Sequence, residues 1–320
     1  MKILPTPAAV LAFMFGMLGG LGFAPWNLAP LMIGSLAVLL YLFERLTAAG
    51  GGRARAFRLA WSWGFGNFLV GQFWIAKAFE FQANMPPVLG WVAVVALSAI
   101  MALYPGVSAA VAVRFRRDPL ARTLAFAGVW MLSEWLRGYL FSGFGWNPLG
   151  VVALPLGDLA QVAALIGTLG VSGLLVLTAC GAANIARGRW RLGGLLSAPA
   201  ILGMVLGGLS LQPMVETTTR IDIIQANIGQ DEKYGPDALQ RAIRRYALLT
   251  PPPGNGPRLL IWPEAAIPDL LDERALLRQD LGRALLGPND LLIVGALKGI
   301  RGSRGTIEAA YNSLYILAPD

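Results

Sequence analysis

The sequence predicts a multi-span α-helical membrane domain that is followed by a partial α/β domain. Three observations lead to this fold class. Of the 320 residues, 56% are hydrophobic and 14% are charged, whereas roughly a quarter are charged in ordinary soluble domains. Apolar runs of membrane-helix length fill the chain up to residue 212. Strand-like and helix-like segments then alternate at short spacing. We therefore predict one domain over residues 1–212 and another over residues 213–320.

Seven segments of the first part are candidates for membrane-spanning helices, because each approaches the roughly 20 apolar residues that a span requires. They are residues 7–24, 28–43, 59–79, 88–113, 121–136, 156–185 and 192–211. The first resembles a signal peptide but lacks a clear cleavage site, so we interpret it as a helix. Glycines four residues apart, such as Gly16 and Gly20, indicate close helix packing.

The net charge of +8 comes from arginines that cluster after every second apolar segment. These are Arg45, Arg53, Arg55 and Arg58, then Arg114, Arg116, Arg117 and Arg122, then Arg187, Arg189 and Arg191. Cytoplasmic loops of membrane proteins carry such an excess of positive charge. We therefore predict a cytoplasmic N-terminus and, after an odd number of spans, a periplasmic second domain on a bacterial inner membrane. The same distribution argues against nucleic acid as a partner.

The chain has no histidine, and its single cysteine, Cys180, lies in an apolar stretch. Within these residues this excludes metal sites built on His and Cys clusters, Ser-His and Cys-His catalysis, and a disulfide framework. We predict neither a metal nor a cofactor. Cys180 is expected to pack as a small buried residue of a membrane helix.

The second part reads as an α/β layer with a buried sheet and the order βαβαββ. The predicted strands are residues 220–226, 259–262, 291–297 and 310–317, and the predicted helices are residues 236–249 and 271–286. The segment is only about 100 residues long and stops just after a strand, and small α/β domains are usually larger. From this architecture we expect the chain to be cut off partway through the domain.

Glu264 is the strongest catalytic candidate. It follows a strand of Leu, Ile and Trp, and it is flanked by Pro263 and by Ala265, Ala266 and Ile267, which predicts largely apolar surroundings. A carboxylate in such surroundings is suited to act as a general base. Spacing alone leaves a second interpretation open, in which Glu264 is a helix-capping or surface residue of a turn.

Four segments resemble one family. Residues 260–268 (Leu-Ile-Trp-Pro-Glu-Ala-Ala-Ile-Pro) resemble the strand that carries the catalytic glutamate of nitrilase-superfamily proteins, and the Pro-Glu-x-x-Ile-Pro form is similar to that of the apolipoprotein N-acyltransferases. Residues 141–146 resemble the family's periplasmic segment after the fifth span, residues 224–230 its first nitrilase strand and turn, and residues 311–313 the strand beyond the glutamate. The resemblance implies that residues 213–320 are the N-terminal part of a nitrilase-like αββα sandwich.

The resemblance also implies an activity, the last step of bacterial lipoprotein maturation. A cysteine thiolate takes an acyl chain from a phospholipid as a thioester, and the amine of an N-terminal diacylglyceryl-cysteine on an apolipoprotein then attacks it. The implied partners are the phospholipid donor, the diacylated apolipoprotein and the lipid bilayer. The family uses a Glu-Lys-Cys triad, of which Glu264 matches the glutamate. The lysine and cysteine lie further along in the family, so we expect this chain alone to be inactive.

Neither Lys298 nor Cys180 is expected to replace the missing residues. Lys298 is predicted to lie in a charged turn between two strands, and Cys180 inside the membrane toward the cytoplasmic end of the sixth span. Catalysis by a thiol requires the nucleophile and its base to lie within hydrogen-bond reach.

Four further residues are candidates for substrate binding. Arg137, near the outer end of the fifth span, would bind a lipid phosphate through its guanidinium, with a pair to Glu134 as the alternative. Trp146 and Tyr234 would line an acyl or head-group entrance, with an interfacial anchor as the alternative for Trp146. Asn312 belongs to the strand segment that the family resemblance places beyond the glutamate.

Two other functions remain open at the level of sequence. A membrane-tethered amidase of the nitrilase type would send water, instead of an amine, to the thioester. A non-enzymatic polytopic protein, such as a transporter or a membrane anchor, is the other alternative. Transporters usually place ionisable or broken-helix sites near mid-membrane, and apart from Glu134 the predicted spans show little of that.

Overall fold

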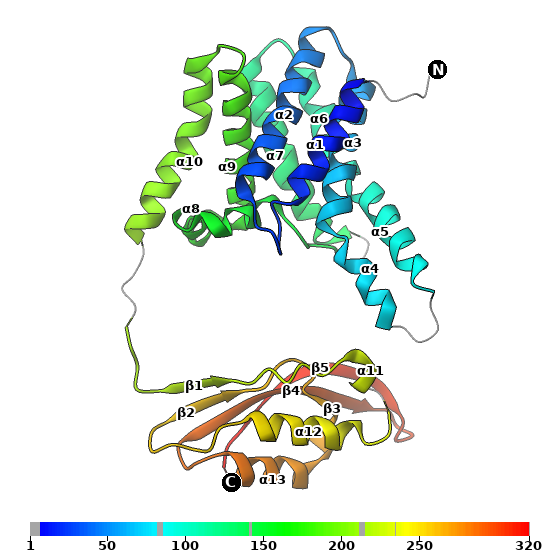
Figure 1. Ribbon diagram of the computed structural model, residues 1–320, viewed down its shortest axis with the longest axis vertical. Helices are drawn as coiled ribbons and strands as arrows, with labels where there is room; N and C mark the ends of the chain where they lie inside the picture. The colour runs from blue at the N-terminus through cyan, green and yellow to red at the C-terminus, as the bar shows by residue number, and fades with distance from the viewer. Residues whose placement is uncertain (1–6, 82–85, 141–142, 211–214, 234, 320) are drawn as a thin grey trace. The chain divides into compact units, whose positions relative to one another are not determined.

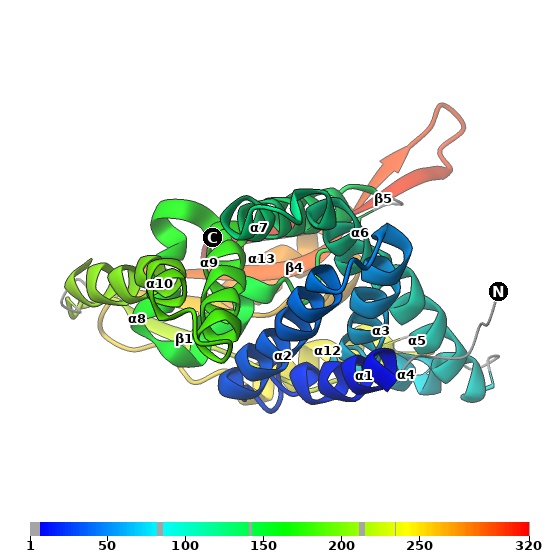
Figure 2. The ribbon, with the colours of Figure 1, turned by 90° about the horizontal axis from the view of Figure 1, so that it is seen from above.

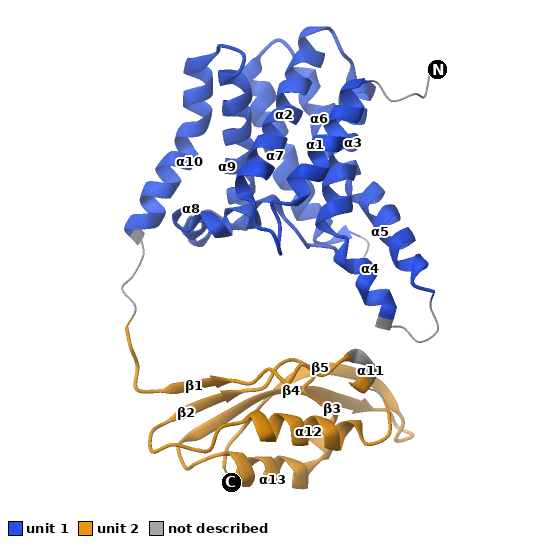
Figure 3. Cartoon of the chain, viewed as in Figure 1, with its two compact units in different colours: residues 1–212 blue, residues 213–320 orange. Residues whose placement is uncertain are grey.

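The computed structural model describes residues 7–81, 86–140, 143–210, 215–233 and 235–319. The chain divides into two compact units, Met1–Gln212 (unit 1) and Pro213–Asp320 (unit 2), which are coloured separately in Figure 3. Unit 1 is helical and unit 2 contains all the strands of the described residues. Each unit has its own hydrophobic core.

Unit 1 is a bundle of helices (Figure 1). Its α-helices are α1 (Pro7–Gly20), α2 (Ala29–Ala48), α3 (Arg53–Gly71), α4 (Trp74–Ala78), α5 (Val88–Met101), α6 (Leu103–Ala112), α7 (Pro119–Arg137), α8 (Asp158–Gln161), α9 (Ala163–Ile185) and α10 (Trp190–Ser210). Within the described residues the 3₁₀ segments of this unit are η1 (Phe79–Phe81), η2 (Val113–Phe115) and η4 (Leu149–Leu156). Within the described residues, four helical segments are long and apolar enough to cross a membrane: Ala29–Ala48, Val88–Phe115, Ala163–Ile185 and Trp190–Leu209. Seven spans remain a prediction.

Two of the predicted spans are interrupted. Helix α5 ends at Met101 and α6 begins at Leu103, because Pro105 has no N–H to donate to the carbonyl of Met101. In the sixth segment, Gly157 (φ 50°) separates η4 from α8, and Gly167 (φ 70°) bends α9. Only glycine adopts such positive φ values without strain, so these residues set the breaks.

Small residues let the helices of unit 1 approach closely. A Cβ on Gly16 would lie 2.0 Å from the carbonyl oxygen of Trp63, and one on Gly20 would lie 2.7 Å from the Val70 side chain. The predicted close packing of α1 is therefore confirmed, and its partner is α3. Seen from above in Figure 2, α2 lies between α1 and α9 and contacts both.

Unit 2 is a mixed five-stranded sheet with two longer helices. Its elements are β1 (Arg220–Ile223), α11 (Gln230–Lys233), α12 (Ala238–Leu249), β2 (Arg258–Ile261), β3 (Ile267–Leu270), η5 (Leu271–Glu273), α13 (Ala275–Leu285), β4 (Asp290–Arg301) and β5 (Ile307–Leu317). Strands β1, β2, β4 and β3 are parallel in that order, and β5 pairs antiparallel with β4. Figure 2 shows the far end of the β4–β5 hairpin extending as a two-stranded ribbon.

Strand β3 is an element that the sequence did not predict. Residues Arg258–Ile261 of β2 pair with the first residues of β4, and Ile267 and Leu270 of β3 pair with Ala296 and Leu297 further along β4. Since β5 occupies the other edge of β4, β2 and β3 follow one another along the same edge. The turn between them contains Glu264.

Helices α12 and α13 lie on one face of the sheet (Figure 1). The side chains of Leu292, Val294 and Ala296 of β4 point to that side and are buried. The other face carries Ile221 and Ile223 of β1 and Leu314 and Ile316 of β5, which are 58–74% exposed. Within unit 2 the predicted sheet is therefore buried on one face only, because no described residue of this unit covers the second face.

Candidate active site

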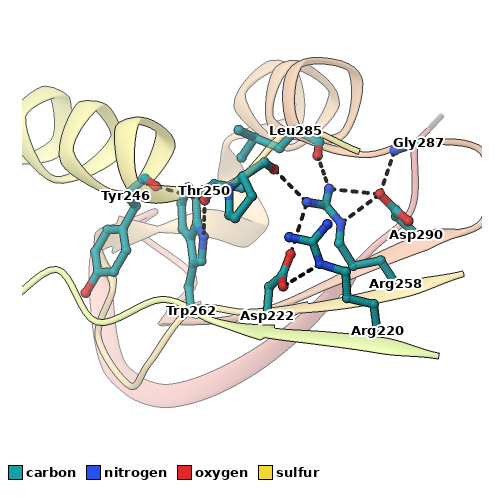
Figure 4. Close-up of polar contacts among 10 residues, drawn as sticks. Arg220, Asp222, Tyr246, Thr250, Arg258, Trp262, Leu285, Gly287 and Asp290 are labelled. Atoms are coloured by element: carbon teal, nitrogen blue, oxygen red, sulfur yellow. Dashed lines mark hydrogen bonds and ion pairs between the residues drawn. The ribbon is translucent and has the colours of Figure 1, made fainter. Parts of the chain in front are cut away.

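The strand that leads to Glu264 is anchored to α12 by Trp262 (Figure 4). The backbone N–H of Trp262 donates to the carbonyl of Ile293 at 2.8 Å. Its buried indole stacks on Tyr246 with 4.8 Å between ring centroids, and its Nε1 donates to Thr250 Oγ1 at 3.2 Å. Burial raises the pKa of the Tyr246 phenol. The carboxyl end of β2 is thus fixed by a ring stack and a hydrogen bond.

The turn that follows is shaped by Ala265 and Gly295. Ala265 adopts a left-handed conformation with φ 51°, and the Pro263 carbonyl accepts a hydrogen bond from Gly295 N–H at 3.3 Å. A Cβ on Gly295 would lie 2.6 Å from the Pro263 oxygen and 2.7 Å from Glu264 Cα. Only glycine fits there. Sequence reasoning did not single out Gly295, which is one of two glycines in β4.

Glu264 is paired with Asn312. The Nδ2 group of Asn312 donates a hydrogen bond to Oε1 of Glu264. In the β4–β5 ladder Asn312 stands opposite Leu297, so it lies on the same face of the sheet as Leu314 and Ile316. The pair therefore sits on the face that the helices do not cover.

The predicted apolar surroundings of Glu264 are wrong, because its side chain is exposed. The reversal at Ala265 explains this result. Ala266 and Ile267 turn into the core, where they are at most 2% exposed, while the carboxylate remains outside. The surface interpretation is incomplete as well, since Asn312 fixes one carboxylate oxygen.

Lys298 lies within a strand, so the predicted charged turn at this residue is wrong. Strand β4 continues to Arg301, and Lys298 pairs with Tyr311 of β5. Cross-strand hydrogen bonds along the hairpin extend the strand beyond what apolar patterning indicates. Cys180 is 4% exposed in α9, and its predicted role as a small buried residue is confirmed.

Arg137 ends α7 and is buried at 3% exposure. Its guanidinium lies over the ring of Phe68, 5.4 Å from the centroid. Glu134 makes other contacts: its Oε1 accepts from Trp130 Nε1 at 3.0 Å and from Leu149 N–H at 2.7 Å. Within the described residues no ion pair of 4 Å or less joins Arg137 to Glu134. A cavity of about 20 Å³ beside both side chains has room for a water molecule.

Trp146 is 60% exposed and contacts Trp74 edge to face, with 5.5 Å between ring centroids. The next residue fixes the segment, because Asn147 Nδ2 donates to the Gly71 carbonyl at 2.8 Å. Tyr234 lies outside the described residues, as do residues 141 and 142 of the sequence segment that ends at Trp146.

The structure thus brings together two of the five predicted site residues. Glu264 and Asn312 share a hydrogen bond in unit 2. Arg137 and Trp146 belong to unit 1 and contact different aromatic residues there. Within the described ranges, no group of three or more His, Cys, Asp or Glu side chains could hold a metal ion.

Comparison with known proteins identifies the family. The family model described as the apolipoprotein N-acyltransferase N-terminal domain matches residues 15–181, just over half of the chain. The chain belongs to the apolipoprotein N-acyltransferase family. The matched region includes Arg137 and Trp146.

Relatives of this family extend the similarity into unit 2. The apolipoprotein N-acyltransferase of Rhizobium rhizogenes is 31% identical over 97% of this chain, and that of Brucella melitensis is 32% identical over 97%. The apolipoprotein N-acyltransferase of Rhodopseudomonas palustris is 32% identical over 98%. In each case the chain spans 61% of the length of the relative. The four apolar helices and the family together make this an integral membrane protein.

Proposed function

We propose that this chain is the membrane domain and the first part of the catalytic domain of an apolipoprotein N-acyltransferase. The enzyme would move an acyl chain from a phospholipid to the N-terminal diacylglyceryl-cysteine of an apolipoprotein. Membership of the family supports the reaction class. One observation carries the site: a carboxylate fixed at the end of β2 by Trp262, Gly295 and Asn312. In this proposal unit 2 faces the periplasm and the N-terminus is cytoplasmic.

In this reaction Glu264 is the general base. It would take the proton of a cysteine thiol, whose thiolate then displaces a lysophospholipid and keeps the acyl group as a thioester. The amine of the acceptor would attack this thioester, which forms an amide and restores the thiol. Asn312 engages Oε1, so Oε2 is the oxygen that would receive the proton. Asn312 would act by orienting the carboxylate.

The nucleophile is not among the described side chains. The single cysteine of the sequence, Cys180, is buried in a helix of unit 1 that qualifies as a membrane span. We therefore expect the 320-residue polypeptide to transfer no acyl chain by itself. A catalytic lysine and cysteine would have to come from additional chain.

The substrate-binding roles of Arg137 and Trp146 also remain proposals. Trp146 is exposed beside Trp74, as an aromatic residue at a membrane interface or an acyl entrance would be. Arg137 is packed against the ring of Phe68, and the adjoining cavity of about 20 Å³ does not accommodate a phosphate. Contact between Arg137 and a lipid phosphate would require the side chain to leave that ring.

An acyl-transfer assay tests the proposed function. The purified polypeptide is incubated with phospholipid and a synthetic diacylated lipopeptide, and the peptide mass is followed for the gain of one acyl chain. We expect no gain with the 320 residues. If the reading frame extends past codon 320, its full product should add one acyl chain, and Glu264→Gln should reduce the rate at least a hundredfold, because general-base catalysis contributes about that much.

The same assay distinguishes the alternatives. Hydrolysis of a thioester or amide without transfer to the lipopeptide would indicate an amidase. Transfer by the full product that is unchanged in Glu264→Gln would overturn the assignment of the base. Asp280→Asn, which alters an exposed carboxylate of α13, is the matched control and should leave the rate unchanged.

A further inference from the structure

The ends of α2 and α9 border a shallow hollow of about 600 Å³ in unit 1 that is wide open to solvent and remote in sequence from every predicted site residue. We call it the arginine hollow. It is lined by Tyr41, Arg45, Ala48, Ala49, Arg187 and Arg189. All of its charged lining residues are therefore positive, which points to an anionic ligand.

The nearest carboxylate is already occupied. Glu44 is buried, and its two oxygens accept hydrogen bonds from Nε and Nη2 of Arg122, each at 2.6 Å. Arg189 Nη1 lies 3.5 Å from the same carboxylate. The single negative charge of Glu44 is therefore shared by Arg122 and Arg189. It does not neutralise Arg45 or Arg187.

Arg45 and Arg187 have no carboxylate within 4 Å in the part of the chain that the structure describes. The Nε atom of Arg187 is also buried without a hydrogen-bond partner among those residues. A buried N–H of this kind costs free energy until an acceptor reaches it. An anion in the hollow would supply that acceptor and would offset the surplus of positive charge.

The backbone holds the two later arginines at the hollow. The carbonyl of Asn184 accepts hydrogen bonds from the N–H groups of both Arg187, at 3.0 Å, and Arg189, at 2.9 Å. Gly188, with φ 76°, reverses the chain between them. Arg45 is fixed separately in the last turn of α2. The backbone positions of these three arginines are therefore set by the ends of α2 and α9.

We propose that the arginine hollow binds the phosphate of an anionic phospholipid. Arginine forks hydrogen-bond phosphate oxygens in pairs, and Tyr41, Ala48 and Ala49 provide less polar surface for the adjoining glycerol and acyl carbons. The arginine clusters of this side are the ones that the positive-inside rule places at the cytoplasmic leaflet, whose anionic lipids attract basic groups. The site is distinct from the chemistry at Glu264 and does not depend on it.

Native mass spectrometry of the 320-residue protein tests this proposal. The protein in detergent is mixed with phosphatidylglycerol or with phosphatidylcholine of the same acyl chains, and the lipid that stays bound after release from the detergent is measured. We expect selective retention of phosphatidylglycerol. The double variant Arg45→Gln/Arg187→Gln should bind it about tenfold more weakly, since each basic group near an anionic surface contributes a few-fold. The pair Arg53→Gln/Arg55→Gln removes the same charge from exposed residues outside the hollow and should bind as the wild type does.

Several outcomes would overturn the proposal. These are equal retention of the two lipids, equal losses in the two double variants, or displacement of phosphatidylglycerol by millimolar inorganic phosphate, which would make the ligand a free anion. An unchanged melting temperature in phosphatidylcholine shows that the double variant is folded. If the double variant is not folded, Arg187→Lys replaces it. This variant keeps the positive charge but loses the paired N–H donors of the guanidinium group, and it should still bind phosphatidylglycerol more weakly than the wild type.

Discussion

Arg258 of unit 2 and Arg122 of unit 1 are both buried, but they differ in how their charge is balanced. Arg258 in unit 2 is 2% exposed and Arg122 in unit 1 is 4% exposed. Arg258 meets Asp290 at 2.8 Å and Asp222 at 3.4 Å, and it also donates to the carbonyls of Pro251 and Leu285 (Figure 4). Arg220 also forms an ion pair with Asp222, so two arginines are balanced by two aspartates.

The network of unit 1 has the opposite balance. Arg122 and Arg189 share Glu44, and two more arginines line the hollow beside it. The comparison teaches that a buried arginine is not by itself a sign of function. Where carboxylates and carbonyls satisfy all of its hydrogen bonds, as at Arg258, a buried arginine joins elements of the fold. Where arginines outnumber carboxylates, as around Glu44, positive charge remains that can bind an anion.

The largest expected effect comes from breaking the balanced network. Asp290→Ala removes the closest carboxylate from Arg258 and leaves its charge buried, which should destabilise unit 2 by about 4 kcal/mol. Hydrogen exchange of peptides from β2 and β4, measured in the intact chain, reports this loss. Asp280→Ala, at an exposed aspartate, is the control. Unchanged protection in Asp290→Ala would contradict the structural role of the network.

A smaller effect with a second readout is expected in unit 1. Glu44→Gln removes the charge that Arg122 and Arg189 share, at a cost of about 3 kcal/mol, because a buried guanidinium loses its counter-ion. The melting temperature in phosphatidylcholine should therefore fall. Retention of phosphatidylglycerol should rise, since the hollow becomes more positive. A parallel fall of both quantities would contradict the idea that surplus charge favours an anion.

The smallest effect is expected where a pair is exposed. Arg301 holds Glu273 with two hydrogen bonds, of 2.7 Å and 2.6 Å, and this contact lowers the pKa of Glu273. Because the pKa of Glu273 is lower in the folded state, its contact with Arg301 stabilises the fold at pH values above the ordinary pKa of about 4.5. This stabilisation disappears as the pH falls through the lowered pKa. Arg301→Gln should leave the melting temperature at pH 7 nearly unchanged, because solvent screens the pair. Any difference from the wild type should vanish in acid.

The sequence predicted the broad fold because its signals are local. The apolar runs, the short strands around Trp262 and the Pro-Glu motif each occupy adjacent residues. Strand β3 was missed because Ile267–Leu270 contains Pro268 and pairs with β4 at only two positions. The hairpin was predicted too short because its ladder, and not apolar alternation, holds residues 298–301.

The site was predicted less completely, for a related reason. The motif identified Glu264, but the positive φ of Ala265, which decides where the carboxylate lies, depends on Gly295 in another strand. Similarly, Arg122 was counted as a loop residue, although it lies in the first turn of α7 and pairs with Glu44, 78 residues earlier. Contacts across such separations leave no pattern in a single sequence.

The bare face of the sheet has a practical consequence. Ile221 and Ile223 form one exposed aliphatic row on β1, and Leu314 and Ile316 form another on β5. Surfactant molecules will coat such a row, and copies of the polypeptide will associate through it when surfactant is scarce. The choice and amount of surfactant will therefore govern whether a preparation stays dispersed, in the globular part as much as in the hydrophobic bundle.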